Sequence, residues 1–272
     1  MITSIKYVLK ENFSNLYRIY CIAKYELLAD MRDSKFGLLW NFLSPAIQVL
    51  TYWLIFGIAW NRKPVGDIEY LPWLVIGYGA WWFIQPCITT GCKAVFSKTN
   101  VITKMKFPVS VLPATICCKE FFNHICMMVI AFVVVIAFGY YPNLYWLCLL
   151  YYAVCAFVFT ESVTLILSVL TMLWRDVKKL VVSLIRMLMY FSPVIWECEF
   201  ESSVSHYKLF NFILKLNPIH YIIDGYRDSV FYKTGFWAHP VYTAYFWIVT
   251  LILFVIGCCL MYKFKHKFID LI

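Results

Sequence analysis

Long apolar stretches separated by short charged segments set the pattern of this 272-residue chain. Each stretch is close to the ~20 residues that a helix needs to cross the hydrocarbon core of a bilayer. Because backbone polar groups cannot remain unpaired in lipid, such stretches are expected to be helical. The pattern therefore predicts an all-α integral membrane protein with six transmembrane helices, at residues 38–60, 70–92, 111–138, 144–173, 180–196 and 240–262.

Two short amphipathic pieces lie between the fifth and sixth stretches, at 207–216 and 219–232, and Asn217-Pro218 separates them. Apolar segments of ~10–14 residues are too short to cross a bilayer and are typical of re-entrant or interfacial helices. Asn is a common N-cap and Pro suits the first helical position, so the second piece is predicted to begin at Pro218. We expect two short re-entrant helices that enter the membrane from its outer face and turn back.

The second re-entrant helix carries charge on one face. Tyr221, Asp224 and Asp228 share that face at helical spacing, and Arg227, three residues after Asp224, can pair with it. The helix can present these carboxylates toward the outer leaflet, or the face can simply be solvated. The pattern leaves both interpretations open.

The N-terminal segment is amphipathic rather than uniformly apolar. Between residues 5 and 27, apolar residues recur every three or four positions, with Glu11, Ser14 and Arg18 on the far side. This pattern is typical of a helix that lies in the membrane interface with its polar face in water. The chain thus divides into an N-terminal cytoplasmic amphipathic helix at 1–35, a transmembrane domain at 36–263 and a short cytoplasmic tail at 264–272.

Composition supports the membrane assignment, and the distribution of charge predicts the orientation of the chain in the membrane. Hydrophobic residues make up 62% of the chain and charged residues only 14%, which excludes a soluble domain because its surface needs more charge. Of the 24 Lys and Arg residues, 16 fall on one side of the predicted spans and six on the other. Since cytoplasmic loops retain Lys and Arg, both termini are predicted to be cytoplasmic. The net charge of +9 therefore indicates topology and attraction to anionic membrane lipids, not a nucleic-acid partner.

Four charged residues fall inside the predicted spans: Lys119, Glu120, Glu161 and Arg186. A charge at the bilayer centre costs at least ~2.5 kcal/mol, so it usually has a partner or a role. Glu161 lies 13 residues before Trp174 and Arg186 lies 12 after it, so a hairpin about that turn places both at similar depth. We predict that Glu161 and Arg186 face each other or share one polar cavity. Structural pairing and contact with a transported molecule both remain possible for the four residues.

The motifs of several enzyme classes are missing from the sequence. It contains no G-x-x-x-x-G-K-[ST] loop to hold ATP phosphates, no H-E-x-x-H and no G-x-S-x-G. The five His show no metal spacing, and most of the 11 Cys lie in or beside predicted spans as small core residues. We therefore expect no catalytic residue, no metal and no cofactor on this chain.

A series of short motifs, in order along nearly the whole chain, carries a family resemblance. They are RDSKFGLLWNFLSP at 32–45, KFPV at 106–109 followed by Leu112-Pro113, WRDV at 174–177, SPVI at 192–195, LNPI at 216–219 and DGYRD at 224–228. The chain resembles the membrane subunit of type-2 ABC exporters for polysaccharides, and most of all the subgroup that translocates wall teichoic acid. Permeases for O-antigen and capsule are similar in the same places.

The resemblance implies a homodimeric permease that binds two copies of a separate ATP-binding cassette subunit. That partner would use ATP and Mg, and this chain would not itself be an enzyme. The expected substrate is a cell-wall polymer, wall teichoic acid, linked to undecaprenyl diphosphate and moved across the bacterial cytoplasmic membrane. The alternatives are a type-2 exporter of another glycan, such as O-antigen or capsule, and a membrane enzyme acting on polyprenyl-linked sugars.

The resemblance also assigns roles by position. The connector between the second and third spans would couple to the ATPase through Phe96, Lys98, Lys104 and Lys106. The broken pair would form an outer gate with Asn217, Pro218, Asp224, Arg227 and Asp228. Spans one, two and five would line the substrate path. Candidate path residues are Trp40, Tyr52, Trp53, Phe56, Trp81, Trp82, Arg186 and Tyr190, whose rings can stack against sugars or lipid or simply pack against neighbouring helices.

Overall fold

The computed structural model describes residues 1–32, 35–99, 107–197 and 206–265. Within these ranges the regular elements are helices, and the only β-type contact is an isolated bridge between Val65 and Ile68. The fold class predicted from the pattern, all-α, is thus confirmed for the described part of the chain.

The helices follow the predicted order with changed boundaries. They are α1 (Ile2–Ser14), α2 (Leu16–Arg32), η1 (Gly37–Leu39), α3 (Trp40–Tyr52), η2 (Trp53–Ala59), α4 (Tyr70–Gly91), η3 (Phe96–Lys98), α6 (Val111–Ala137), η4 (Leu144–Leu147), α7 (Cys148–Leu173), α8 (Val177–Tyr190), α9 (Tyr207–Lys215), α10 (Pro218–Arg227), η5 (Asp228–Tyr232), η6 (Phe236–Ala238) and α11 (Pro240–Phe264). The N-terminal helix, predicted as one, is two, because the chain leaves helical geometry at Asn15.

Among the described residues, four helical segments are long and apolar enough to cross a membrane: Trp40–Ala59, Val111–Ala137, Leu144–Leu173 and Pro240–Phe264. The second predicted span corresponds to α4, of 22 residues. The fifth is shorter than predicted, since α8 has 14 residues and ends at Tyr190 instead of continuing to 196. Pro193 disfavours helical geometry at the residue before it, which accounts for the early end. The structure is that of an integral membrane protein, and the count of six spans stays a prediction.

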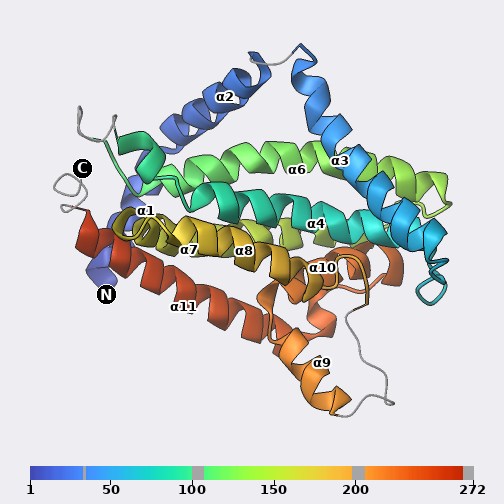
Figure 1. The fold of residues 1–272 in the computed structure, drawn as a ribbon. Helices are drawn as coiled ribbons and strands as arrows, with labels where there is room; N and C mark the ends of the chain where they lie inside the picture. Colours follow the sequence, from blue (N-terminus) through green and yellow to red (C-terminus); the bar gives the residue numbers. More distant parts are fainter. Residues whose placement is uncertain (33–34, 100–106, 198–205, 266–272) are drawn as a thin grey trace.

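Helix α4 lies at the centre of the bundle, where α3, α6, α7, α8 and α10 pack around it (Figure 1). Its residues are buried on every side from Trp73 to Trp81. Small residues let neighbouring helices approach closely, and α4 carries Gly77, Gly79 and Ala80 in its middle turns. The centre of the bundle is therefore the place where side chains of several spans can meet.

Helix α1 and the C-terminal end of α11 lie at the same end of the bundle (Figure 1). The ring of Tyr7 in α1 meets Tyr262 of α11 edge to face, with centroids 5.4 Å apart, and Lys265 lies over Tyr7. At this end the Arg175 guanidinium also covers the ring of Phe96. The amphipathic helix, the connector and the turn after α7 thus share one end, as the predicted hairpin topology requires.

Candidate functional site

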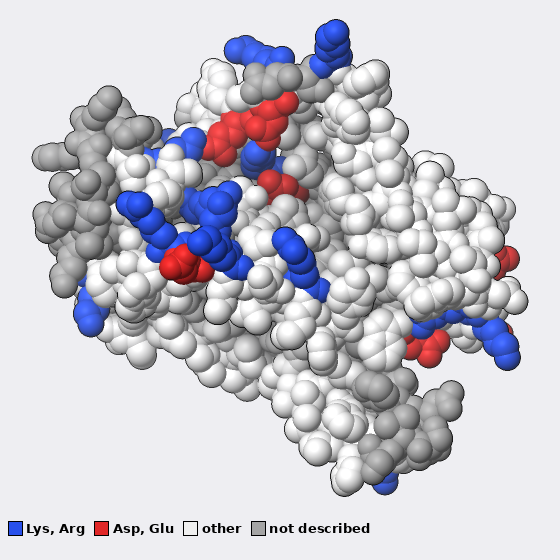
Figure 2. Space-filling model, viewed as in Figure 1, with Lys and Arg blue, Asp and Glu red and all other residues white. Residues whose placement is uncertain are grey.

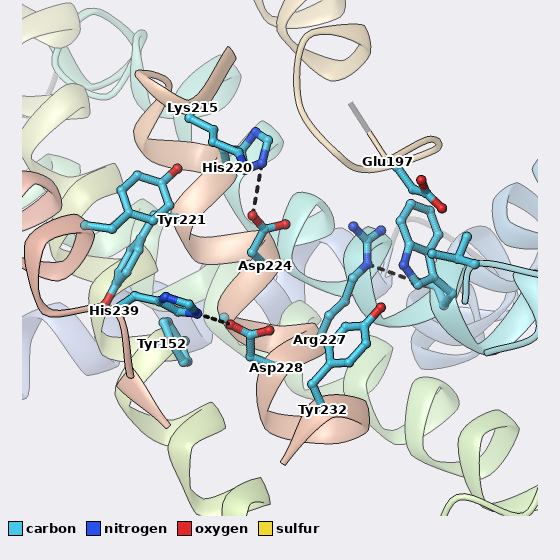
Figure 3. Close-up of a pocket in the computed structure, with 14 residues that line it drawn as sticks. Tyr152, Glu197, Lys215, His220, Tyr221, Asp224, Arg227, Asp228, Tyr232 and His239 are labelled. Atoms are coloured by element: carbon cyan, nitrogen blue, oxygen red, sulfur yellow. Dashed lines mark hydrogen bonds and ion pairs between the residues drawn. The ribbon is translucent and has the colours of Figure 1, made fainter. Parts of the chain in front are cut away.

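A polar cavity of about 500 Å³ lies at the other end of the bundle, beside α10 (Figure 3). Aromatic, acidic and basic side chains line it together. They are Val65, Trp73, Tyr152, Glu197, Lys215, His220, Tyr221, Asp224, Gly225, Arg227, Asp228, Tyr232, His239 and Tyr242. We call this space the α10 cavity.

Helix α10 begins where the sequence predicted. The side-chain oxygen of Asn217 accepts from the backbone N–H of Ile219 at 3.1 Å, and Pro218 occupies the first turn. The amide nitrogen of Asn217 donates to the hydroxyl of Ser192 at 2.8 Å, which ties the cap to the segment after α8. Most of α10 is buried among α4, α7 and α11, whereas Asp224 and Asp228 on its polar face are partly exposed in the cavity. Presentation of this face toward the outer leaflet and its solvation therefore both stay predictions. The ten-residue helix is too short to cross a bilayer.

Arg227 anchors the far end of α10 inside the protein. Its side chain is only 3% exposed. It donates to the backbone carbonyls of Trp73 at 3.3 Å, Val194 at 3.2 Å and Pro193. A buried guanidinium is stable only when its donors are used, and these carbonyls use them. The predicted pairing of Arg227 with Asp224 is wrong, because the ion pair of Asp224 is with His220.

Two carboxylates of α10 and η5 point into the cavity, each beside an imidazole (Figure 3). Asp224 lies 3.0 Å from Nε2 of His220, and Asp228 lies 3.9 Å from Nε2 of His239. Burial raises the pKa of Asp228 to about 6, the negative charge of Asp224 adds to the increase, and His239 opposes it. The cavity therefore holds a carboxyl group that changes charge between acid and neutral pH.

Aromatic side chains form the remaining wall of the cavity. The hydroxyl of Tyr221 lies 2.9 Å from the hydroxyl of Thr243, and its ring stacks on Phe246. Tyr152 packs so tightly against Gly225 that a Cβ on this glycine would lie 2.0 Å from its ring. Rings together with carboxylates and imidazoles suit the non-covalent binding of a hydroxyl-rich ligand, since the ring faces stack and the polar groups accept or donate hydrogen bonds.

Five residues predicted from the sequence lie at the α10 cavity or on the helix that supports it: Asn217, Pro218, Asp224, Arg227 and Asp228. The two histidines of the cavity, His220 and His239, were not predicted from the sequence. The four-residue spacing of His220 and Asp224 on a helix was a usable signal. His239 carried none, since it reaches Asp228 from a different segment.

The predicted path residues do not form one surface. Trp40 and Trp82 line a second, smaller cavity between α3, α4 and α6, whereas the neighbouring Trp81 has no exposed surface and packs in the core. Further out on the first span, Tyr52, Trp53 and Phe56 are half-buried: Tyr52 packs on Tyr78, and Trp53 is among the half-buried rings beside Val65, Ile68 and Tyr70. Tyr190, at the end of α8, is exposed.

The predicted pair of Glu161 and Arg186 is wrong. Both residues lie in the described part of the chain, yet no ion pair joins them. Arg186 is exposed on α8, and a buried carboxylate oxygen of Glu161 has no hydrogen-bond partner. Similar depth in the membrane does not determine the rotation of a helix about its axis, and α8 turns Arg186 outward. Lys119 did find a partner, Asp30 of α2.

The structure describes two of the four predicted coupling residues. Phe96 is exposed beneath Arg175, and Lys98 forms an ion pair with Glu26 of α2 at 2.6 Å. Lys104 and Lys106 lie outside the described residues. Within the connector, the structure therefore places Phe96 and Lys98 against the turn after α7 and against the amphipathic helix.

Comparison with known proteins places the chain among transporters. The family model described as ABC-2 type transporter matches residues 17–231. The chain belongs to the ABC-2 type transporter family. The O-antigen export system permease protein RfbA of Klebsiella pneumoniae is 23% identical over 266 residues, which cover 97% of this chain and 98% of the relative. The protein of the same description from Myxococcus xanthus is 24% identical over 208 residues, 76% of this chain and 77% of the relative.

The match to the ABC-2 type transporter family spans the helices from α2 to η5. It includes the whole of α10 and all residues named above for the second cavity, while Tyr232, His239 and Tyr242 of the α10 cavity lie beyond it. The predicted resemblance is thus confirmed at the level of the ABC-2 type transporter family, and the wall teichoic acid subgroup stays a prediction. The chain is the membrane protein of a transporter.

Proposed function

We propose that this ABC-2 type protein is the membrane-spanning permease subunit of an ATP-driven exporter of a lipid-linked polysaccharide. The observation that carries the proposal is the similarity to O-antigen export permeases over 97% of the chain. The α10 cavity supports it, because aromatic rings can stack on a sugar and the carboxylates beside them can accept hydrogen bonds from its hydroxyl groups. The missing phosphate-binding loop fits a subunit that leaves ATP hydrolysis to its partner.

The relatives favour an O-antigen-like polysaccharide over wall teichoic acid as the exported polymer. The relatives from Klebsiella pneumoniae and Myxococcus xanthus are O-antigen export permeases. The sequence motifs, which resemble the teichoic acid subgroup most, are shared with O-antigen permeases in the same places. We therefore take O-antigen-type glycan export as the leading substrate class and retain wall teichoic acid as its competitor. Attachment to undecaprenyl diphosphate is part of the proposal for both.

The proposed assembly contains two copies of this chain and two ATP-binding cassette subunits in the bacterial cytoplasmic membrane. Large apolar side chains remain exposed on α3 and α8, among them Leu43, Ile47 and Leu184, where lipid or a second copy can cover them. With six spans and both termini cytoplasmic, α1 and the connector face the ATPase. Lys104 and Lys106, together with Phe96 and Lys98, are the proposed coupling residues.

Depletion of the protein in its own bacterium tests the function. The expected result is that a lipid-linked glycan accumulates inside the cell while the same glycan disappears from the surface, and sugar analysis of that lipid identifies the polymer. Ribitol or glycerol phosphate in the accumulated lipid would favour teichoic acid, and a neutral repeating glycan would favour the O-antigen type. Normal surface glycan without accumulation would contradict the proposal, as would turnover of a nucleotide sugar by the purified chain alone.

A further inference from the structure

The second cavity lies in the opposite half of the bundle from the α10 cavity. Its volume is about 320 Å³, and it lies between the first turns of α3, the second half of α4 and the first half of α6. These parts are at the end that carries α1 and the connector. By the predicted topology this is the half nearest the cytoplasm. We call the space the inner cavity.

The polar groups around the inner cavity are incompletely satisfied. Glu120 is only 7% exposed, and its carboxylate accepts from the amide of Asn123 at 2.8 Å. The amide oxygen of Asn123 and the amide nitrogen of Asn41 are buried with no hydrogen-bond partner. A buried donor or acceptor without a partner costs ~1–3 kcal/mol, so a water molecule or a ligand that bonds these two groups would stabilise the protein.

Rings form the other wall of the inner cavity. Trp40 and Trp82 line it from two different helices. Behind them, the buried Trp81 donates from its indole nitrogen to the side-chain oxygen of Gln85 at 2.8 Å. Because an indole N–H can only donate, it fixes the Gln85 amide with its oxygen toward Trp81 and leaves the amide N–H groups as donors. The cavity thus combines flat apolar faces with fixed donors and acceptors.

Charge around the inner cavity limits what it can hold. Glu120 contributes a carboxylate to its wall, and an anionic group would be repelled by it. The neighbouring cation, Lys119, is already engaged by Asp30 of α2. Acidic and basic side chains gather in the hollow between α2 and α3 (Figure 2), where Glu26 also engages Lys98. The positive charges near this opening are therefore balanced by α2.

We propose that the inner cavity binds one neutral sugar ring of the exported glycan before the glycan crosses the membrane. Two Trp faces suit stacking on a sugar ring, and Asn41, Asn123 and Glu120 suit its hydroxyl groups. The volume is at the lower end of the ~300–1,000 Å³ of ligand sites, which fits a single ring rather than a chain. This proposal rests on the proposed export function and adds a loading site to it.

Saturation-transfer NMR on the full-length protein in lipid nanodiscs tests the cavity directly. The probes are methyl glycosides of glucose, galactose and N-acetylglucosamine, compared with glucuronic acid and glycerol 3-phosphate. We expect saturation transfer to at least one neutral glycoside and none to the two anions. Binding of the anions equal to that of the neutral glycosides, or binding of none of the probes, would overturn the proposal.

Variants assign the binding to the cavity. Glu120→Gln and Trp82→Leu should each weaken glycoside binding about tenfold, since each removes a charged acceptor or a stacking face. Matched controls are Glu161→Gln, a buried intramembrane carboxyl outside both cavities, and Trp60→Leu, an exposed ring on the same span as Trp40. Equal binding by all four variants would refute the assignment. If Glu120→Gln does not fold, Trp82→Leu and the wild-type preference for neutral probes still decide it.

The outcomes separate this site from the general function. If depletion causes a lipid-linked glycan to accumulate but no glycoside binds, the loading site is wrong and export stands. If glycosides bind as expected but depletion leaves the surface glycan normal, export is wrong and the cavity is a sugar site of another process.

Discussion

The guanidinium carbon of Arg227 lies 3.3 Å from the centroid of the Trp73 ring, so the end of α10 rests directly on the start of α4. The same side chain donates to carbonyls on α4 and on the segment after α8. Arg227 therefore joins α10, α4 and the segment after α8. Because it also lines the α10 cavity, its packing and the shape of that cavity are linked.

Replacing Arg227 by Lys should disrupt this junction. Lysine carries one compact ammonium and lacks the planar fork that reaches several carbonyls while stacking on a ring. Loss of one or two charged hydrogen bonds predicts a destabilisation of about 2–4 kcal/mol, together with loss of export. Thermal unfolding of the purified protein in detergent and surface glycan in cells measure the two effects. Arg62→Lys is the matched control, since Arg62 donates to one carbonyl, that of Ile195, and should tolerate lysine.

Because Gly77 has no side chain, it leaves the space that the Arg227 side chain occupies. A Cβ at Gly77 would lie 2.1 Å from a guanidinium nitrogen, so Gly77→Ala should displace the arginine and impair folding and export much as Arg227→Lys does. Gly79→Ala, two residues further along α4, would meet only the flexible sulfur of Met128 at 2.9 Å. We expect a clearly smaller drop in thermal midpoint for it. Equal drops for the two alanine variants would show that general α4 packing, and not Arg227, sets the effect.

Local signals in the sequence located the site better than they described its contacts. Asn217-Pro218 fixed the start of α10, because capping depends only on neighbouring residues. The partners of Arg227 were not predictable, since backbone carbonyls of Trp73, Pro193 and Val194 leave no mark in the residue pattern. The family motifs contained these residues without saying what they touch.

The apolar pattern could not predict how each helix is rotated about its own axis. A buried span is apolar on all sides, so its sequence does not say which face meets which neighbour. Depth alone placed Glu161 opposite Arg186, and the structure turns Arg186 outward. Likewise Trp81 and Trp82 look equivalent in the sequence, yet one is fully buried and the other lines a cavity.

The ion pair between Lys98 and Glu26 ties the connector to the amphipathic helix. The two side chains are 36% and 23% exposed, and ion pairs near the surface typically add only ~0–1 kcal/mol. We therefore expect the pair to matter for coupling to the ATPase more than for stability. Lys98→Glu should lower ATP-dependent export with little change in thermal midpoint. The charge swap Lys98→Glu with Glu26→Lys should restore export in part if the pair matters. No recovery in the swapped variant would indicate that Lys98 acts on the ATPase and not through α2.

Asp228 predicts a pH dependence of stability. Its pKa is raised to about 6 in the folded protein, chiefly by burial, whereas an exposed Asp titrates near ~4. A raised acid pKa means that the folded state favours the protonated carboxyl, so the stability it contributes is full below pH ~4 and is lost as pH rises through 6. Asp228→Asn keeps the neutral form at every pH. The variant should therefore unfold at a higher temperature than wild type at pH 7.5 and at the same temperature at pH 4.

Thermal unfolding in detergent across pH 4–8 checks the pH dependence attributed to Asp228. The other groups around this carboxyl must contribute equally in wild type and variant for the comparison to be valid. Asp224, Thr234, Arg227 and His239 surround it and stay unchanged in Asp228→Asn, so they contribute equally to both curves. Asp176→Asn, an exposed carboxyl at the opposite end of the bundle, should follow wild type throughout. A constant offset between Asp228→Asn and wild type at all pH values would contradict the prediction, because it would indicate lost contacts and not a titrating buried charge.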